Sequence, residues 1–341
     1  MSKIDYKSAG VDILAGEQAV LSIKQMVKST YNQNVMGELG SFGGLYRFDQ
    51  AAYQQPILVS STDGVGTKLR VAIMAKRFDT IGQDLVNHCV NDILVQGAQP
   101  LFFLDYIGLA RMKPDMVSGI IGGMVNACKA NGCALIGGEM AEMPGIYHEG
   151  DFDLVGTIVG VVDQANLLPS GRINKGDILL GIPSSGLHTN GYSLARKIIF
   201  EHLKLEIDSY VQECGASVAE LLLSVHRSYL SMIRPYLTNP SLHGLAHITG
   251  GGIPGNLKRI IPEGLSAIVT YHEREYPPLF RWLQQSAAID NEVMLQSFNL
   301  GIGMIAVVEE NLVQDMLADT GAIVLGEIAE SRSGQGAVQL V

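Results

Sequence analysis

Residues 82–100 read GQDLVNHCVNDILVQGAQP, and this stretch predicts a helix with one apolar side and one polar side, followed by a strand. Wound as an α-helix, it carries six apolar side chains on one side, namely Leu85, Val86, Cys89, Val90, Ile93 and Leu94. The other side carries only short polar side chains, namely Asp84, Asn87, His88, Asn91 and Asp92. Their spacing of three and four residues confines them to an arc of about 140°. Gly97 and Pro100 predict that the helix ends before an apolar strand begins.

The polar side of this helix differs from a surface that faces water. A solvent-facing surface normally carries Lys, Glu, Arg or Gln, whereas Asn and Asp are poor helix formers. One interpretation is that the short side chains pack on a polar partner or cap neighbouring loops. The other is that two aspartates, two amides and one histidine coordinate a divalent cation, directly or through water, next to phosphate groups.

Strand-like and helix-like segments alternate on both sides of this helix. In the first half, the pattern predicts strands at 57–61, 101–108, 133–137 and 153–163, and helices at 67–76 and 113–131. In the second half, it predicts strands at 178–182, 266–270, 303–308 and 322–328, and helices at 191–203 and 217–235. The alternation predicts a protein of helices and strands in two halves. We expect an α+β fold of two α/β-layered domains, the second with a mixed sheet plus helices.

The two domains are expected to meet in the polar, turn-rich segment QANLLPSGRINKGD at 164–177. We therefore expect an N-terminal domain over residues 1–165 and a C-terminal domain over residues 172–341.

Composition excludes several classes of function. The chain has 341 residues, 47% hydrophobic and 17% charged, and a formal charge of -10. This charge argues against non-specific nucleic-acid binding, and no apolar run is long enough to span a bilayer. The N-terminus has no basic region followed by an apolar stretch, and the four cysteines form no C-x-x-C pair. We therefore expect a cytoplasmic protein that binds neither nucleic acid nor membranes.

A glycine turn at the end of the first predicted strand is a candidate phosphate-binding loop. STDGVGTKLRVAIMA at 61–75 joins a strand end to a helix start through Gly64 and Gly66. Glycines let backbone N–H groups approach phosphate oxygens, and a helix N-terminus adds positive potential. The stretch does not match the Walker A pattern. The alternative is an ordinary Asp-Gly turn followed by a solvated lysine.

Three later loops also carry polar groups beside strand ends. GGEMAEMPG at 137–145 places Glu139 and Glu142 after a strand, where ligand sites of layered α/β proteins tend to lie. PSSGLHTNGYS at 183–193 offers hydroxyl, imidazole and amide groups at a helix start. HITGGGIPGNLKRIIP at 247–262 contains a weak match to the dinucleotide fingerprint, with a proline inside it. Ordinary capped or exposed turns are the alternative for each of them.

Taken together, the motifs resemble one known family. The chain contains, in order, DYKSAGVDI (5–13), GSFGGLY (40–46), STDGVGTKL (61–69), VNDILVQGAQPLFFLDY (90–106), GGEMAEMPGIY (137–147), GIPSSGLHTNGYSLARK (181–197), HITGGGIPGN (247–256) and FNLGIGM (298–304). This set resembles phosphoribosylformylglycinamidine cyclo-ligases over nearly the whole chain. The pattern D-x-x-x-x-G-A-x-P from Asp92 to Pro100 is shared with a wider superfamily of ATP-using enzymes. The chain departs from the family at His88, where a methionine or alanine is usual.

The resemblance implies an activity, cofactors and an assembly. Family members use ATP and Mg²⁺ to convert formylglycinamidine ribonucleotide to aminoimidazole ribonucleotide, with release of ADP and phosphate, in purine biosynthesis. They are homodimers in which each N-terminal sheet pairs with that of its mate into a β-barrel. Other ATP-dependent superfamily members, such as small-molecule kinases, and a nucleotide-binding protein without catalysis are the competing readings.

The resemblance also implies roles for individual residues. The metal ligands would be Asp63, Asn91, Asp92 and Glu139. The nucleotide would bind Gly64, Gly66, Thr67, Lys68, Asn87 and Asp105. The catalytic groups would be Lys68, His188 and Asn190, the last two on the substrate side.

Overall fold

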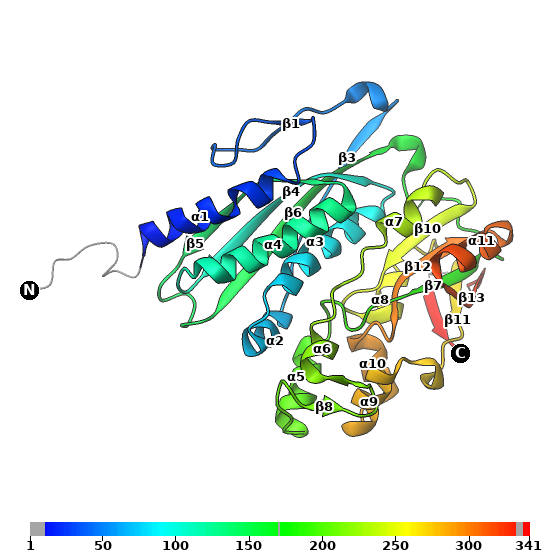
Figure 1. Ribbon diagram of the computed structural model, residues 1–341. Coiled ribbons are helices and arrows are strands. Elements are labelled where there is room, and N and C mark those ends of the chain that lie inside the picture. The colour runs from blue at the N-terminus through cyan, green and yellow to red at the C-terminus, as the bar shows by residue number, and fades with distance from the viewer. Residues whose placement is uncertain (1–10, 170, 332–336) are drawn as a thin grey trace, which may run out of the picture. The chain divides into compact units, whose positions relative to one another are not determined.

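The computed structural model describes residues 11–169, 171–331 and 337–341, and these form two compact units. The first unit holds the described residues up to Ile93 together with Gln99–Val161. The second unit holds Leu94–Ala98 and the described residues from Val162 onward. Each unit layers helices on a β-sheet (Figure 1), so the expected α+β class is confirmed.

The first unit is built on a four-stranded sheet. In chain order its strands are β3 (Pro56–Gly64), β4 (Gln99–Leu109), β5 (Ala134–Glu142) and β6 (Phe152–Asp163). Across the sheet the order is β3-β6-β4-β5, with β4 parallel to β5 and antiparallel to β6. A separate pair is formed by β1 (Val35–Met36) and β2 (Leu45–Tyr46). β3 and β5 therefore lie at opposite edges of the main sheet.

Helices cover one face of this sheet. The unit contains α1 (Ile13–Lys28), α2 (Lys68–Ala75), α3 (Asp79–Leu94), α4 (Pro114–Asn131) and a short 3-10 turn at Gln50–Ala52. Figure 1 shows α1, α3 and α4 on the same side of the sheet. The six apolar side chains of α3 are completely buried, as its sequence predicts. The helix ends at Leu94, and Gly97 follows with φ of 82° in a closing turn.

Two glycines allow α3 and α4 to cross closely. A Cβ atom added at Gly82 would lie 2.0 Å from the carbonyl oxygen of Ile120, and one added at Gly123 would lie 2.0 Å from that of Asp79. A side chain at either position would separate the two helices.

The second unit is built on a six-stranded mixed sheet, which confirms the expectation for the C-terminal half. Its strands are β7 (Ile178–Pro183), β10 (Leu242–His247), β11 (Leu265–Val269), β12 (Ile302–Val308), β13 (Ile323–Glu330) and β14 (Ala337–Leu340). Their order is β10-β12-β7-β13-β11-β14. The pair β11 and β14 is parallel and the other pairs are antiparallel. A small hairpin is formed by β8 (Tyr210–Val211) and β9 (Ala216–Ser217).

Short helices surround this second sheet. They are α5 (Tyr192–Arg196), which continues as a π-helical turn at Lys197–His202, α6 (Val218–Leu222), α7 (Leu230–Ile233), α8 (Gly252–Leu257), α9 (Pro278–Ser286), α10 (Asn291–Ser297) and α11 (Glu310–Thr320). Short 3-10 turns lie at Gln164–Asn166, Arg234–Tyr236 and Glu273–Glu275. Within the described ranges, no helix is long and apolar enough to cross a membrane.

One predicted element is wrong. The helix expected at 217–235 is interrupted between α6 and α7, and residues 223–229 form a non-helical segment. Ser224 donates its hydroxyl to the carbonyl of Ser185, and Ser185 donates its own hydroxyl to the carbonyl of Val225. The Arg227 guanidinium donates to the carbonyl of Pro183. These bonds to the 183–193 loop take the place of helical hydrogen bonds, which an apolar periodicity cannot reveal.

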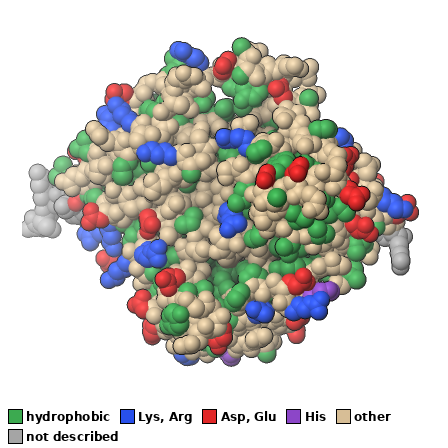
Figure 2. All heavy atoms as spheres, turned by 45° about the vertical axis from the view of Figure 1, so that its right-hand side comes forward, with side chains coloured by type: hydrophobic (Ala, Val, Ile, Leu, Met, Phe, Trp, Pro, Cys, Tyr) green, Lys and Arg blue, Asp and Glu red, His purple; other side chains and the backbone are tan. Residues whose placement is uncertain are grey.

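The surface charge agrees with the composition. On the face that Figure 2 shows, acidic and basic side chains are interspersed and do not gather into a continuous basic stripe.

Candidate active site

A histidine between two carboxylates lies where β3 ends beside α3. The Nε2 atom of His88 lies 2.9 Å from Oδ2 of Asp63 and 3.8 Å from Oδ2 of Asp92. The Ser61 hydroxyl donates to Oδ2 of Asp92 over 3.0 Å. Two of the predicted metal ligands, Asp63 and Asp92, are thus brought together around one nitrogen atom.

His88 is the group of this cluster to which no individual role was assigned from the sequence. Burial lowers its pKa, but the hydrogen bond that it donates to Asp63 and the charges of Asp92, Asp63 and Asp84 outweigh burial and raise the pKa above its ordinary value. The signal in the sequence was its position on the polar side of the helix, four residues before Asp92.

Lys68 lies inside the unit as half of a buried ion pair. Its ammonium group is 2.7 Å from Oδ2 of Asp84, and both side chains are fully buried. Burial lowers the pKa of Lys68, and the charge and hydrogen bond of Asp84 act in the opposite direction. Asp84 belongs to the polar side of α3, so this part of the helix face binds a lysine of α2. The interpretation that the face packs on a polar partner therefore holds for Asp84.

The glycine turn before α2 has the backbone conformation that its glycines predict. Gly66 has φ of 65°, and the N–H group of Gly64 donates to Oδ1 of Asp63 over 2.6 Å. Thr67 is the N-cap residue of α2, and its side chain makes no capping bond there. The N–H groups of Leu69 and Arg70 donate to the carbonyls of Gly66 and Thr67, each over 3.2 Å, so backbone bonds close this first turn.

The two asparagines on the polar side of α3 are buried. Asn87 accepts a hydrogen bond from the side-chain amide of Asn131 on α4 over 2.9 Å, and Asn131 also donates to the carbonyl of Ala127. Asn91 is fully buried. The oxygen of Asn87 therefore contributes to the joining of α3 and α4, and its predicted contact with the nucleotide stays a prediction.

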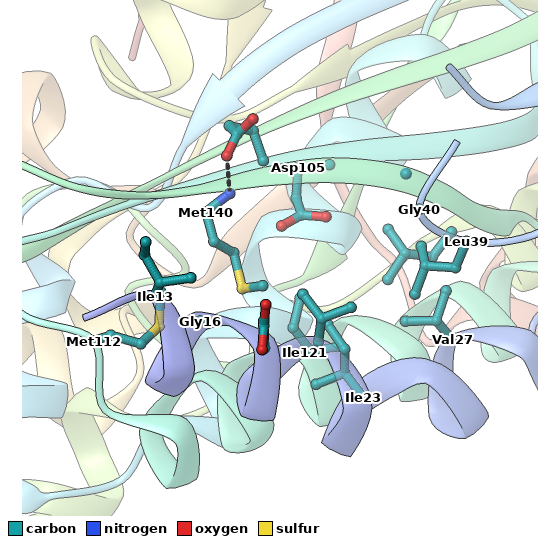
Figure 3. Close-up of a pocket in the computed structure, with 16 residues that line it drawn as sticks. Ile13, Gly16, Ile23, Val27, Leu39, Gly40, Asp105, Met112, Ile121 and Met140 are labelled. Carbon is teal, nitrogen blue, oxygen red and sulfur yellow. Dashed lines mark hydrogen bonds between the residues drawn. The ribbon is translucent and has the colours of Figure 1, made fainter. Parts of the chain in front are cut away.

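Asp105 and Glu139 lie around a different feature, a cavity of about 320 Å³ between α1, α4 and the β4–β5 edge of the sheet. Figure 3 shows the Asp105 carboxyl pointing into the cavity, above Ile23 and Val27 of α1. Burial raises the pKa of Asp105 to about 7. Position 138, beside Asp105, has room only for glycine, because a Cβ atom added at Gly138 would lie 2.3 Å from Oδ1 of Asp105.

Glu139 is separated from the histidine–carboxylate cluster within the first unit. It is exposed on β5, and its Oε1 accepts from the N–H group of Met140 over 2.9 Å. Asp63 is on β3, three strands away across the sheet, which corresponds to about 14 Å. The four predicted metal ligands are therefore not brought together as one set, although the metal role of Glu139 itself stays a prediction.

Glu142, at the end of β5, binds two backbone N–H groups. Its two carboxylate oxygens accept from the N–H groups of Asp12 and Met112 over 2.6 and 2.5 Å. Asp12 is the N-cap residue of α1, so Glu142 ties the start of that helix to the sheet.

We expect the replacement Asp105→Asn to stabilise the protein at high pH only. The folded pKa of about 7 lies above the ordinary 3.8, so the wild type loses stability as the pH rises between these values. Asn cannot ionise, so the variant does not have this loss. For a half-buried group we expect its free energy of unfolding to exceed that of wild type by about 1–2 kcal/mol above pH ~7. Thermal unfolding from about pH 5 to pH 8.5 measures it. In the exposed control Asp115→Asn, the difference in stability from wild type should not change with pH. A pH-independent difference for Asp105→Asn as well would contradict the raised pKa.

In the second unit, the 183–193 loop holds His188 in a constrained conformation. His188 has φ of 60°, which is uncommon for a residue other than glycine, and its side chain is buried. Its Nε2 accepts from the backbone N–H group of Ser185 over 3.2 Å. Among the described residues, the side-chain nitrogen of Asn190 is buried and has no hydrogen-bond partner. A buried amide donor of this kind is suited to a substrate oxygen.

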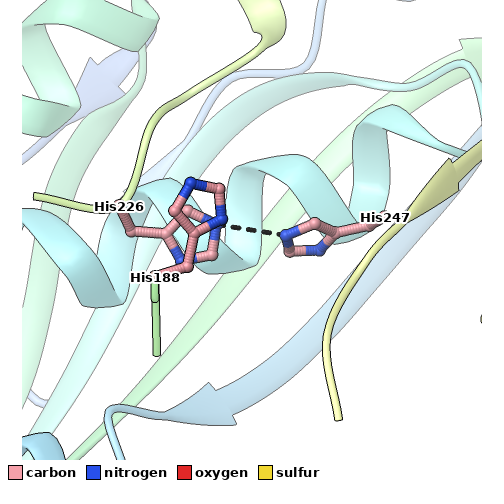
Figure 4. Close-up of side chains that lie close together, drawn as sticks. All are labelled: His188, His226 and His247. Carbon is pink, nitrogen blue, oxygen red and sulfur yellow. Dashed lines mark hydrogen bonds between the residues drawn. The ribbon is translucent and has the colours of Figure 1, made fainter. Parts of the chain in front are cut away.

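Two further histidines lie near His188, and neither was assigned a role from the sequence. The rings of His188 and His226 stack with centroids 3.9 Å apart, and Nε2 of His226 lies 3.1 Å from Nε2 of His247. Figure 4 shows the three imidazoles together. His226 belongs to the segment between α6 and α7 that was expected to be helical, so no sequence signal pointed to it.

The glycine-rich stretch after β10 has a packing role. A Cβ atom at Gly252 would lie 1.8 Å from the carbonyl oxygen of Leu295, and Gly251 and Gly252 have φ of 92° and 62°. The side-chain amide of Asn256 donates to the carbonyls of Thr249, Gly250 and Gly252. The glycines thus allow the loop to close around one asparagine and to approach α10.

Comparison with known proteins gives matches over most of the chain. The model for AIR synthase related protein, N-terminal domain, matches residues 48–162, and that for the C-terminal domain matches residues 174–339. The phosphoribosylformylglycinamidine cyclo-ligase of Alkaliphilus metalliredigens is 47% identical over 334 residues, 96% of each chain. That of Geobacter sulfurreducens is 47% identical over 341 residues, 98% of each chain.

Solved structures support the fold. The thiamine-monophosphate kinase of Stenotrophomonas maltophilia is 16% identical, with a TM-score of 0.67 over 94% of this chain and 95% of that one. The hydrogenase maturation protein HypE in complex with ATP is 19% identical, with a TM-score of 0.64 over 98% and 94%. The motif resemblance is confirmed by the full-length identities, and the chain belongs to the phosphoribosylformylglycinamidine cyclo-ligase family.

Proposed function

We propose that this chain catalyses the ATP-dependent cyclisation of formylglycinamidine ribonucleotide to 5-aminoimidazole ribonucleotide, a step of purine biosynthesis. The observation that carries the proposal is the 47% identity to a phosphoribosylformylglycinamidine cyclo-ligase over 96% of both chains. The γ-phosphoryl group of ATP moves to the formyl amide oxygen and ADP leaves. The amidine nitrogen then attacks the formyl carbon, the carbon–oxygen bond breaks, and phosphate leaves as the ring closes. We place the reaction in the cytoplasm, in keeping with four free cysteines.

Asp63 and Asp92 are the residues we assign to a magnesium ion. Mg²⁺ prefers oxygen ligands, and these carboxylates approach a common point because both face His88. The side chain of Asp63 is 45% exposed and that of Asp92 is 26% exposed, so both are accessible from solvent. When bound there, magnesium would neutralise charge that develops on the transferred phosphoryl group.

ATP phosphates are assigned to the glycine turn at 64–66 and the start of α2. Support comes from the glycine turn with Gly66 at φ of 65°, from the helix start at Lys68 and from their position just after Asp63. The HypE structure of similar fold was solved in complex with ATP. Lys68 contributes from inside the unit, through its ion pair with Asp84, to the placement of α3 relative to α2.

The substrate is assigned to the 183–193 loop of the second unit. Support comes from the buried side-chain donor of Asn190 and from the fixed imidazole of His188. These groups suit the formyl oxygen or the ribose phosphate of the substrate, because both offer acceptors to N–H donors.

We also propose that the protein is a homodimer in which the first-unit sheets pair into a β-barrel. Along β3, Ser61 and Asp63 contact α3, so the alternating residues Leu58, Ser60 and Thr62 lie on the opposite face. Leu58 is 64% exposed on that face. Of the apolar side chains at the start of β4, Leu101 and Phe102 are half-buried, whereas Phe103 belongs to the core.

We expect Leu58→Lys to convert the dimer to a monomer, because a charge on the paired face would have to be desolvated. Sedimentation at micromolar concentration measures the change. Leu21→Lys is the matched control, since Leu21 is 72% exposed on α1, on the other side of the sheet. A wild-type protein that is a stable, active monomer would contradict the proposed assembly.

One assay separates the proposed function from its alternatives. Phosphate release from ATP is followed with and without formylglycinamidine ribonucleotide, and the aminoimidazole product is measured in parallel. We expect phosphate and product to appear together and only with the substrate. Phosphate transfer to another small molecule would indicate a kinase, and ATP binding without turnover would indicate a protein that has lost catalysis.

A further inference from the structure

Three imidazoles of the second unit form one buried cluster. His188, His226 and His247 are 1%, 0% and 6% exposed. One ring nitrogen from each lies within 4.8 Å of the others (Figure 4). Burying three titratable rings together costs free energy, and such clusters are often functional. The cluster is therefore a candidate for a chemical role.

A metal ion bound by all three histidines does not fit the geometry. The His188 and His226 rings are stacked, with centroids 3.9 Å apart and planes inclined by 17°. A metal ion lies in the plane of each imidazole that binds it, at about 2.1 Å from the nitrogen. Two nearly parallel planes that are stacked on each other cannot both contain one ion at that distance.

The hydrogen bond from Ser185 decides which nitrogen of His188 carries a proton. A backbone N–H group can only donate, so Nε2 of His188 accepts this bond with its lone pair. In the neutral ring the proton is then on Nδ1. In this state neither nitrogen has a lone pair that is free to take a proton from a substrate.

His226 and Gly303 hold the His188 ring in place. His226 covers one face of it, and His226 is itself tied at both nitrogens, with Nδ1 3.3 Å from the Thr189 hydroxyl and Nε2 3.1 Å from His247. A Cβ atom at Gly303 would lie 2.4 Å from Cε1 of His188, so the β12 backbone approaches the edge of the ring. The imidazole therefore has little freedom to turn and exchange its two nitrogens.

We propose that His226 is a positioning residue that keeps His188 in its neutral Nδ1–H form, so that His188 serves the reaction as a hydrogen-bond donor and not as a base. This inference rests on the proposed function for the contact between His188 and the substrate. A neutral donor stabilises negative charge as it develops on a substrate or phosphate oxygen. The proton that the attacking nitrogen loses on ring closure passes to another acceptor, and the departing phosphate is the base that the reaction itself supplies.

The protonation state of His188 can be measured without any activity. Nitrogen-15 NMR of histidine-labelled wild-type protein distinguishes the Nδ1–H, Nε2–H and charged forms, and the loss of one signal in His188→Gln assigns the residue. We expect the neutral Nδ1–H form near neutral pH. An Nε2–H or a charged His188 would overturn the inference, even if the enzyme makes the expected product.

Three replacements of His226 separate its ring from its hydrogen bonds. His226→Phe keeps the stacked ring, His226→Gln keeps polar groups without a ring, and His226→Ala removes both. We expect kcat to fall by about 10 to 100-fold in the Ala and Gln variants and to stay within ~3-fold in the Phe variant. The KM for ATP should not change in any of them. Thermal unfolding checks that each variant is folded.

Opposite kinetic outcomes would overturn the positioning role. These are an unchanged kcat in His226→Ala, or a His226→Gln variant as active as wild type beside an inactive His226→Phe. Stoichiometric zinc in untagged wild-type protein that is lost in His226→Ala would replace the inference with a metal site. If the wild type makes no aminoimidazole product, the proposed function fails, and the NMR measurement alone decides the form of His188.

Discussion

Lys68→Met is expected to destabilise the protein by about 3–5 kcal/mol, because it leaves the fully buried carboxylate of Asp84 without its cation. This is the largest stability effect that we expect from a single charge. Denaturant unfolding of wild type and variant measures it. Lys175→Met is the matched control, since Lys175 pairs with Glu330 at 2.9 Å where the side chains are 64% and 75% exposed. The control should change stability by about 0.5 kcal/mol or less.

A double replacement tests the cause of this loss. Lys68→Met combined with Asp84→Leu removes both charges, and buried ion pairs replaced by apolar side chains are often neutral in stability. We expect the double variant to recover most of the stability that Lys68→Met loses. A Lys68→Met variant as stable as wild type, with only its KM for ATP raised, would instead show that the ammonium group serves the nucleotide directly.

Asp92→Asn is expected to lower turnover by about 10 to 100-fold at limiting magnesium, as is typical when a metal site loses a supporting contact. The change keeps the size of the side chain and one oxygen that can accept from Ser61, so we expect the fold to survive. The lost charge weakens metal–ATP binding, because hard cations depend on carboxylate charge. Initial rates over a range of magnesium concentrations measure the effect, and high magnesium should restore part of the rate.

The control for this experiment is Asp115→Asn, which removes an exposed carboxylate from the first turn of α4. It should leave the magnesium dependence unchanged. If Asp92→Asn turns over like wild type at limiting magnesium, Asp92 is not a metal ligand. Its place on α3 would then be explained by its bond from Ser61 and its proximity to His88.

Local pattern was sufficient for most elements of the fold. The apolar side of α3 predicted the buried side because side chains at helical spacing share one face, whatever that face meets. The runs at 178–182 and 303–308 predicted β7 and β12 because they are short, apolar and β-branched. The fold class and the family follow from the order of such segments and from the motifs between them.

The long helix predicted at 217–235 failed because local pattern does not record tertiary hydrogen bonds. Hydrogen bonds of Ser185, Ser224 and Arg227 join two loops that are about 40 residues apart in the chain. These bonds hold the segment that carries His226 in a non-helical conformation. The stacking of His226 on His188 is a consequence of that opening, so it was not visible in the sequence.

The polar side of α3 illustrates the same division. The sequence by itself determined that five short polar groups share one side of a helix, and that an ordinary water-facing surface does not explain them. Only the tertiary structure decided their partners: Asp84 binds Lys68, Asn87 binds Asn131, and His88 and Asp92 gather with Asp63 at the end of β3. The physical reason is that helical spacing is a property of neighbouring residues, whereas an ion pair or a metal site needs groups from separate segments, whose meeting depends on how the whole chain packs.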